Sequence, residues 1–158
     1  MVVPMTIVAY SDPGFGLFYM EGTYILQLNP ENYKRTNKNE MGSLKKKTET
    51  THLANGMAVA KVKTPGAEKI DISFTIDATG AVPGFRTVPT DVALFKKLCF
   101  DVNPSIHTNN WCWLTWGNLS FECKLESLTV EYKLFNSLGL PIRAVLNATF
   151  VEWIDTGE

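Results

Sequence analysis

The chain has few residues of the kinds that build catalytic and metal sites. Among its 158 residues are two histidines and three cysteines, and no pair of cysteines has CxxC spacing. Most nucleophilic triads and many metal sites need histidine, but His52 and His107 lie in polar segments and share no HxxxH spacing. We therefore predict two surface histidines, and no catalytic residue, cofactor-binding residue or metal ligand.

Long apolar runs and an excess of one charge are also absent. No stretch of about 18 apolar residues exists to cross a bilayer, and the formal net charge is -1 at pH 7. We therefore expect no direct membrane insertion, and the overall charge gives no indication of a nucleic-acid partner. The first residues lack the basic flank of a secretory signal, and Cys99, Cys112 and Cys123 lie in apolar runs. These features predict buried free thiols and a cytoplasmic, reducing compartment.

What the sequence does contain is alternation of apolar and polar residues with period 2, which is typical of strands with one buried face. The pattern is clearest at residues 70–77 and 119–126. Apolar residues occupy odd positions up to Leu125 and even positions from Leu128, so one extra residue near 126–127 must keep both halves facing one core. This change of parity predicts a β-bulge or a corner.

The alternation resumes at residues 142–150, after a loop at residues 135–141. Together with the preceding strand, this segment predicts a long antiparallel pair. A further strand is predicted over residues 17–28 and is closed by Pro30, because proline cannot continue a central ladder. The residues before it, through Asp12, are expected to be short and irregular.

One helix is predicted to begin at Pro89-Thr90-Asp91, which offers a hydroxyl cap and an acid in the first turn. Leu94, Phe95 and Leu98 would form its apolar face. The fold class is therefore mainly β with one short α-helix. A closed or nearly closed barrel, or a sandwich of two sheets, would bury the apolar strand faces within a single domain covering residues 1–158.

Residues 33–60 are polar, rich in lysine and poor in large apolar side chains, so we predict a long hairpin arm or a flexible loop that leaves the body. Its basic residues are Lys34, Arg35, Lys38, Lys45, Lys46 and Lys47. Interleaved aromatic residues are missing, which argues against a nucleic-acid site. Two interpretations stay open: a solvated arm, or an arm that contacts an acidic patch on a neighbouring copy.

Other residues that could carry chemistry have simpler interpretations. Asp71 and Asp77 are placed by the alternation on the solvent side of one strand, as solubility or interface charges rather than paired catalytic carboxylates. The four tryptophans could stack on sugars or bases, but in a small β domain they more often fill the core or a subunit interface. They are Trp111, Trp113, Trp116 and Trp153.

Several short motifs follow one another in an order typical of the tube-domain family of contractile injection systems. The motifs are Trp116-Gly117, Tyr132-x-x-Phe135 and Gly139-x-Pro141-x-Arg143-Ala144, preceded by Asn29-Pro30-Glu31 and by Asp77-x-Thr79-Gly80. The chain resembles this family over almost its whole length. The resemblance implies a phage tail-tube fold, in which two sheets form a barrel-like body and a helix packs at the side.

The same resemblance implies a structural role in assembly. Six copies would form a ring, rings would stack into the inner tube, strands would join across subunits to line the lumen, and the hairpin arm would contact the adjacent ring. The implied partners are the chain itself, adjacent tube rings, the spike hub and baseplate proteins. Assembly would take place in the bacterial cytoplasm, and the product would belong to a contractile particle that is released or attached to a membrane.

Within this family the chain is similar to the N-terminal domain of LysM-containing baseplate proteins, which act as tube initiators between the spike hub and the tube. The sequence ends just after the last predicted strand, so we expect no peptidoglycan binding by a LysM module here. A main-tube subunit and a tube initiator are both consistent with the motifs.

The resemblance also assigns roles to particular residues. The expected fold and packing determinants are Trp116, Gly117, Tyr132, Phe135, Gly139, Pro141, Arg143 and Ala144, and the strand-end motif is Asp77, Thr79 and Gly80. Arg143 would anchor a carboxylate or the preceding loop. The alternative function is a monomeric β-barrel binding module for a small apolar ligand or a carbohydrate, with exposed tryptophans as its platform.

Overall fold

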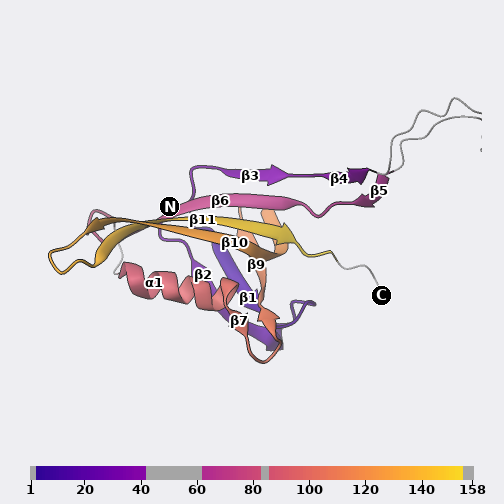
Figure 1. Ribbon diagram of the computed structural model, residues 1–158. Helices are drawn as coiled ribbons and strands as arrows, with labels where there is room; N and C mark the ends of the chain where they lie inside the picture. Colours follow the sequence, from indigo (N-terminus) through magenta and orange to yellow (C-terminus); the bar gives the residue numbers. More distant parts are fainter. Residues whose placement is uncertain (1–2, 42–61, 83–85, 155–158) are drawn as a thin grey trace, which may run out of the picture.

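The computed structural model describes residues 3–41, 62–82 and 86–154, and the chain is mainly β (Figure 1). The strands are β1 (Thr6–Tyr10), β2 (Met20–Ile25), β3 (Tyr33–Thr36), β4 (Asn39–Met41), β5 (Val62–Pro65), β6 (Lys69–Asp77), β7 (Val102–Asn103), β8 (Thr108–Asn109), β9 (Trp111–Trp116), β10 (Leu119–Phe135) and β11 (Pro141–Glu152). The helical segments are the 3-10 turn η1 (Leu17–Tyr19), the α-helix α1 (Val88–Phe95) and the π-helical turn η2 (Lys96–Phe100).

Seven strands form one antiparallel sheet in the order β2-β1-β9-β10-β11-β6-β3. Within the described residues β2 and β3 do not pair with each other, so the sheet stays open and the architecture is sandwich-like. The β10–β11 register shifts between Leu125 and Ser127, which confirms the bulge that the parity change predicted. The pairing of β10 with β9 stops at Cys123, just before this bulge, and β10 continues beside β11 alone.

The hydrophobic core lies between the buried face of this sheet and α1. Tyr24 from β2, Phe74 from β6 and Phe95 from α1 meet there with ring centroids 5.2 to 6.1 Å apart. Edge-to-face and tilted arrangements of this kind stabilise aromatic pairs beyond the area that they bury. The buried residues of β6, β10 and β11 fall at the alternating positions that the sequence predicted.

The α-helix begins after Thr87, and no side chain caps its first turn, so the predicted hydroxyl cap is wrong. Asp91 does lie in the first turn, as predicted. Its carboxylate accepts hydrogen bonds from the Tyr24 hydroxyl at 2.7 Å and from Arg86 at 3.1 Å. The predicted apolar face is only partly correct, because Leu94 is exposed while Phe95 is buried.

The N-terminal segment was expected to be irregular, and this prediction is wrong. Residues Thr6–Tyr10 form β1, which lies inside the sheet between β2 and β9. The signal was hidden because residues 7–10 are all apolar and show no alternation, although Ile7 and Ala9 are buried. The predicted strand over residues 17–28 is shorter, since η1 precedes β2 and β2 ends at Ile25.

The basic segment divides into parts with different structures. Residues Tyr33–Thr36 are not an arm but the edge strand β3, which pairs with β6. Next along the chain, β4 and β5 form a separate antiparallel pair beyond the end of β6 (Figure 1). Lys45, Lys46 and Lys47 lie outside the described residues.

Candidate assembly interface

Several strands present an edge without a neighbouring strand in the part of the chain that the structure describes, and three such segments belong to the large sheet and bear on assembly. Two of them are the terminal strands of the sheet, β2 and β3. The third is the second half of β10, residues 126–135, which pairs with β11 on one side and with no strand on the other. Open edges carry unpaired backbone N–H and C=O groups and readily add a strand from another chain.

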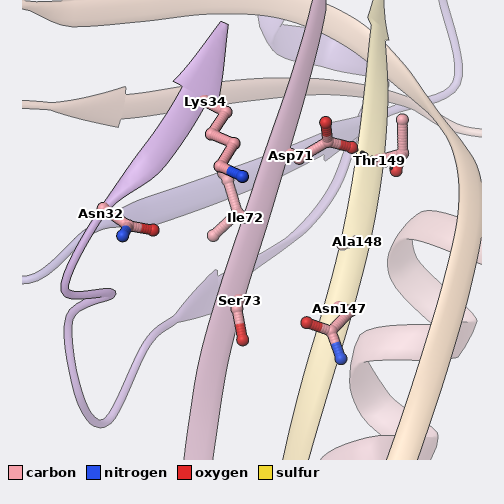
Figure 2. A pocket seen from close by; sticks show the side chains of 8 residues that line it. All are labelled: Asn32, Lys34, Asp71, Ile72, Ser73, Asn147, Ala148 and Thr149. Atoms are coloured by element: carbon pink, nitrogen blue, oxygen red, sulfur yellow. Dashed lines mark hydrogen bonds between the residues drawn. The ribbon is translucent and has the colours of Figure 1, made fainter.

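A polar surface covers the outward face of β3, β6 and β11 (Figure 2). Lys34, Asp71 and Thr149 lie in register across the three strands, and the Thr149 hydroxyl donates to Asp71 at 2.6 Å. Ser73 and Asn147 form the next row and project from the same face. These side chains line an open depression of about 390 Å³. Its hydroxyl, amide and charged groups suit a surface that faces water rather than a closed ligand pocket.

The tip of the β10–β11 hairpin exposes a cluster of apolar side chains. Its members are Tyr132, Leu134, Phe135, Leu138 and Leu140, with exposed fractions between 45% and 82%. A second apolar cluster, in η1 and the start of β2, contains Leu17, Phe18, Tyr19 and Met20, and Phe18 is 99% exposed. Contiguous apolar surface of this kind is typical of interaction sites, whereas single exposed apolar residues are ordinary.

At the base of the hairpin, Arg143 and Asp77 form an ion pair at 3.0 Å between β11 and β6. Asp77 was expected on the solvent side, and this prediction is wrong because its side chain is buried beneath Arg143 and the Thr79 turn. Hydrogen bonds from the Thr79 hydroxyl and backbone, with a further contribution from Arg143, hold the pKa of the Asp77 carboxyl below its usual value. The strand-end motif and the hairpin motif therefore meet in one network.

Most other motif residues lie in the β9–β10 and β10–β11 hairpins, which share β10. Trp116 donates its indole N–H to the Val3 carbonyl at 3.0 Å and packs against the core, and Gly117 follows at a φ of 60°. Gly139 has a φ of 80° in the β10–β11 turn, a conformation that side-chain-bearing residues rarely adopt. Tyr132 lies opposite Ala144, and Phe135 lies opposite Pro141. Gly80 also has a positive φ of 94°, in the turn after β6.

The predicted basic arm residues do not gather in one place. Arg35 forms an ion pair with Glu68, and its guanidinium lies 5.8 Å from the centre of the Phe121 ring. Lys34 joins the polar surface, while Lys38 lies between β3 and β4. Sequence reasoning missed the open edge of β10, because which half of the strand has a partner depends on the three-dimensional pairing of β9.

The residues considered for other chemistry stay apart or buried. All three cysteines are free and buried, as predicted. A hydrogen bond with Cys112 and burial raise the pKa of Cys99, and burial and the nearby Cys112 thiol raise the pKa of Cys123. His107 is exposed, and His52 lies outside the described residues. In the described ranges no group of three or more His, Cys, Asp or Glu residues is arranged to hold a metal ion. No helix in that part of the chain is long and apolar enough to span a bilayer.

No match was found among curated proteins. A family model described as contractile injection system tube protein matches residues 2–158. The match includes the open edges, the polar surface and the hairpin motif described above. The chain therefore belongs to the contractile injection system tube protein family.

Proposed function

We propose that the chain is a structural subunit that forms a ring of six copies, either as part of the inner tube or as the tube initiator that joins the spike hub to the tube. The whole of residues 1–158 would act as one domain, without catalysis or a cofactor. Its partners would be further copies of itself, adjacent tube rings, the spike hub and baseplate proteins. It would assemble in the bacterial cytoplasm and then function within a contractile particle.

This proposal rests on two open edges within the described residues. One belongs to the second half of β10 and the other to β3, at opposite sides of the four strands β10-β11-β6-β3. Two different edges on one molecule favour a head-to-tail contact, and such contacts generate rings when the rotation between copies closes. Joining the edges would also remove an aggregation hazard from each copy. A rigid sheet that runs through successive subunits would suit a tube that is driven forward when a sheath contracts.

The alternative of a monomeric barrel for a small ligand has less support. A ligand-binding barrel needs a closed sheet with an interior cavity. Here the described sheet is open, and its interior is filled by packed apolar side chains.

Size in solution and negative-stain microscopy of the 158-residue chain test the proposal. We expect ring-shaped particles of sixfold symmetry whose mass is a multiple of the 17.6 kDa subunit. A chain that remains monomeric up to the millimolar range, both alone and in the presence of the spike hub, would overturn the proposal. Rings that stack into tubes without other proteins would identify a main-tube subunit, whereas single rings that form on the spike hub would identify the initiator.

A further inference from the structure

The second half of β10 carries an apolar row beyond the core of its own subunit. Leu128 and Val130 pack partly against the core, but the next residue on the same face, Tyr132, is 45% exposed. The backbone edge beside them has no strand within the described residues. A partner at this edge would therefore need to supply both a strand and an apolar layer.

The strand β3 can supply such a strand, because it lies at the opposite side of the four-stranded segment β10-β11-β6-β3. Among the described residues it pairs only with β6, so within that part of the chain its other edge has no neighbouring strand. Tyr33 lies in register with the buried Ile72, and its ring centroid is 6.3 Å from that of Trp116. Lys34 lies in register with Asp71 and therefore projects from the polar face. The edge thus presents an aromatic side chain on the core side and a cation on the polar side.

Strand direction allows these two edges to meet. Each neighbouring pair among β10, β11, β6 and β3 is antiparallel, so β3 runs opposite to β10. If β3 of a second copy lies beside β10 of the first, the new pair is antiparallel like the others. Repeating the contact produces one continuous sheet around a ring.

We propose that β10 of one subunit pairs with β3 of the next, in the register that places Glu131 opposite Lys34. This inference rests on the proposed ring and specifies its contact. In the same register Tyr132 lies opposite Tyr33 on the core side, and Val130 lies opposite Arg35. Opposite charges and aromatic pairs that face each other directly stabilise antiparallel strands.

Other registers lose these pairs. Shifting by one residue would place Lys34 on the wrong face, because side chains alternate between faces along a strand. Shifting by two residues places either Lys133 or Thr129 opposite Lys34, which creates a like-charge pair or removes the charge pair. Both shifts also separate Tyr132 from Tyr33. The charge pattern and the aromatic pattern therefore select the same register.

Cysteine cross-linking tests the contact in the assembled protein. In a Glu131→Cys, Lys34→Cys double variant, mild oxidation should join neighbouring subunits into a ladder of covalent oligomers on a non-reducing gel. Directly opposite residues have Cβ atoms about 4.5 to 5.5 Å apart, close to disulfide geometry, whereas positions displaced by two residues are about 7 to 8 Å apart. The native cysteines are buried, and the unsubstituted chain controls for their cross-linking.

Two matched controls test the register. Lys133→Cys with Lys34→Cys and Thr129→Cys with Lys34→Cys should lose the ladder under the same oxidation. A ladder from either slipped pair, or none from the Glu131 pair in rings of normal shape, would overturn this contact and leave the ring proposal standing. A native chain that forms no rings would instead overturn the ring proposal and this contact with it.

Charge reversal covers the case in which the cysteine variant does not assemble. Glu131→Lys and Lys34→Glu should each reduce ring formation, since each places like charges opposite one another. The double reversal should restore the rings. Failure of the double variant to recover, when both single variants are folded, would overturn the proposed register.

Discussion

The two halves of β10 share one alternating pattern but have opposite surroundings. In the first half, which pairs with β9 up to Cys123, the side chains of Leu119, Phe121, Cys123 and Leu125 are buried in the core. In the second half, the apolar side chains become more exposed toward Phe135, although the alternation continues. The comparison teaches that apolar periodicity records which face of a strand is buried, but not whether its own subunit or a partner covers it.

The largest expected effect on folding comes from the first half. Phe121→Ala should lower the free energy of unfolding by about 3 to 5 kcal/mol, because it removes a buried aromatic side chain and leaves a cavity. Urea denaturation monitored by circular dichroism would measure the change. Phe135→Ala truncates an exposed side chain in the second half. If Phe121→Ala lowered the free energy of unfolding by less than Phe135→Ala does, the distinction between the two halves would be wrong.

The base of the hairpin should show the next largest effect. Asp77→Asn should cost about 1.5 to 3 kcal/mol, since it removes a buried carboxylate that accepts hydrogen bonds from Thr79 and Arg143. Thermal unfolding of this variant can be compared with Asp71→Asn, which alters an exposed carboxylate on the same strand. Equal losses in the two variants would contradict a special role for the buried network.

The pH dependence of stability gives a separate test of the Asp77 network. The folded-state pKa of Asp77 is lowered, so its contribution is fully present above the unfolded-state pKa and is lost as the pH falls through the folded value. The native chain should therefore lose stability below about pH 4. Denaturation curves collected from pH 7 to pH 2 should show a shallower loss for Asp77→Asn, and parallel curves would count against this assignment.

A smaller effect is expected in the turn that joins β10 to β11. Gly139→Ala should cost about 1 to 2 kcal/mol, because alanine resists the positive φ even though no atom lies within 4 Å of the added Cβ. Ser137→Ala in the same turn is the matched control. Denaturant midpoints would measure both, and an unchanged midpoint for the glycine variant would show that the turn can relax.

The smallest effect on folding should come from the second half of β10. Tyr132→Ser should change the free energy of unfolding by less than about 1 kcal/mol, since the side chain is half exposed, yet it should reduce ring formation. Val102→Ser removes an exposed apolar side chain in β7, away from this edge, and should leave rings intact. Calorimetry and negative-stain microscopy together separate folding from assembly, and intact rings with Tyr132→Ser would contradict an interface role.

Local patterns predicted much of the fold. The bulge after Leu125 could be placed because a single extra residue moves every later side chain to the other face. The first strand was missed because residues 7–10 are apolar throughout. Such a run does not separate a buried central strand from an irregular apolar segment.

The candidate interface was harder to predict because it depends on pairing between distant segments. Asp77 follows the polar alternation of its strand, and only the β6–β11 register brings Arg143 and a turn over it. The sequence singled out both residues, but not their partnership across 66 positions. Likewise, the second half of β10 has a free edge in the described sheet because β9 begins beside Cys123, a property of the folded sheet rather than of the strand.

The unpaired borders of the sheet also bear on the life of the protein before assembly. A newly made copy displays hydrogen-bonding groups that any extended peptide could occupy, so it is most vulnerable to misassociation while it is alone. If the edges join as proposed, each correct encounter would hide two such borders at once. Prompt incorporation would therefore protect the protein, and a surplus of unassembled copies would be a hazard to the cell.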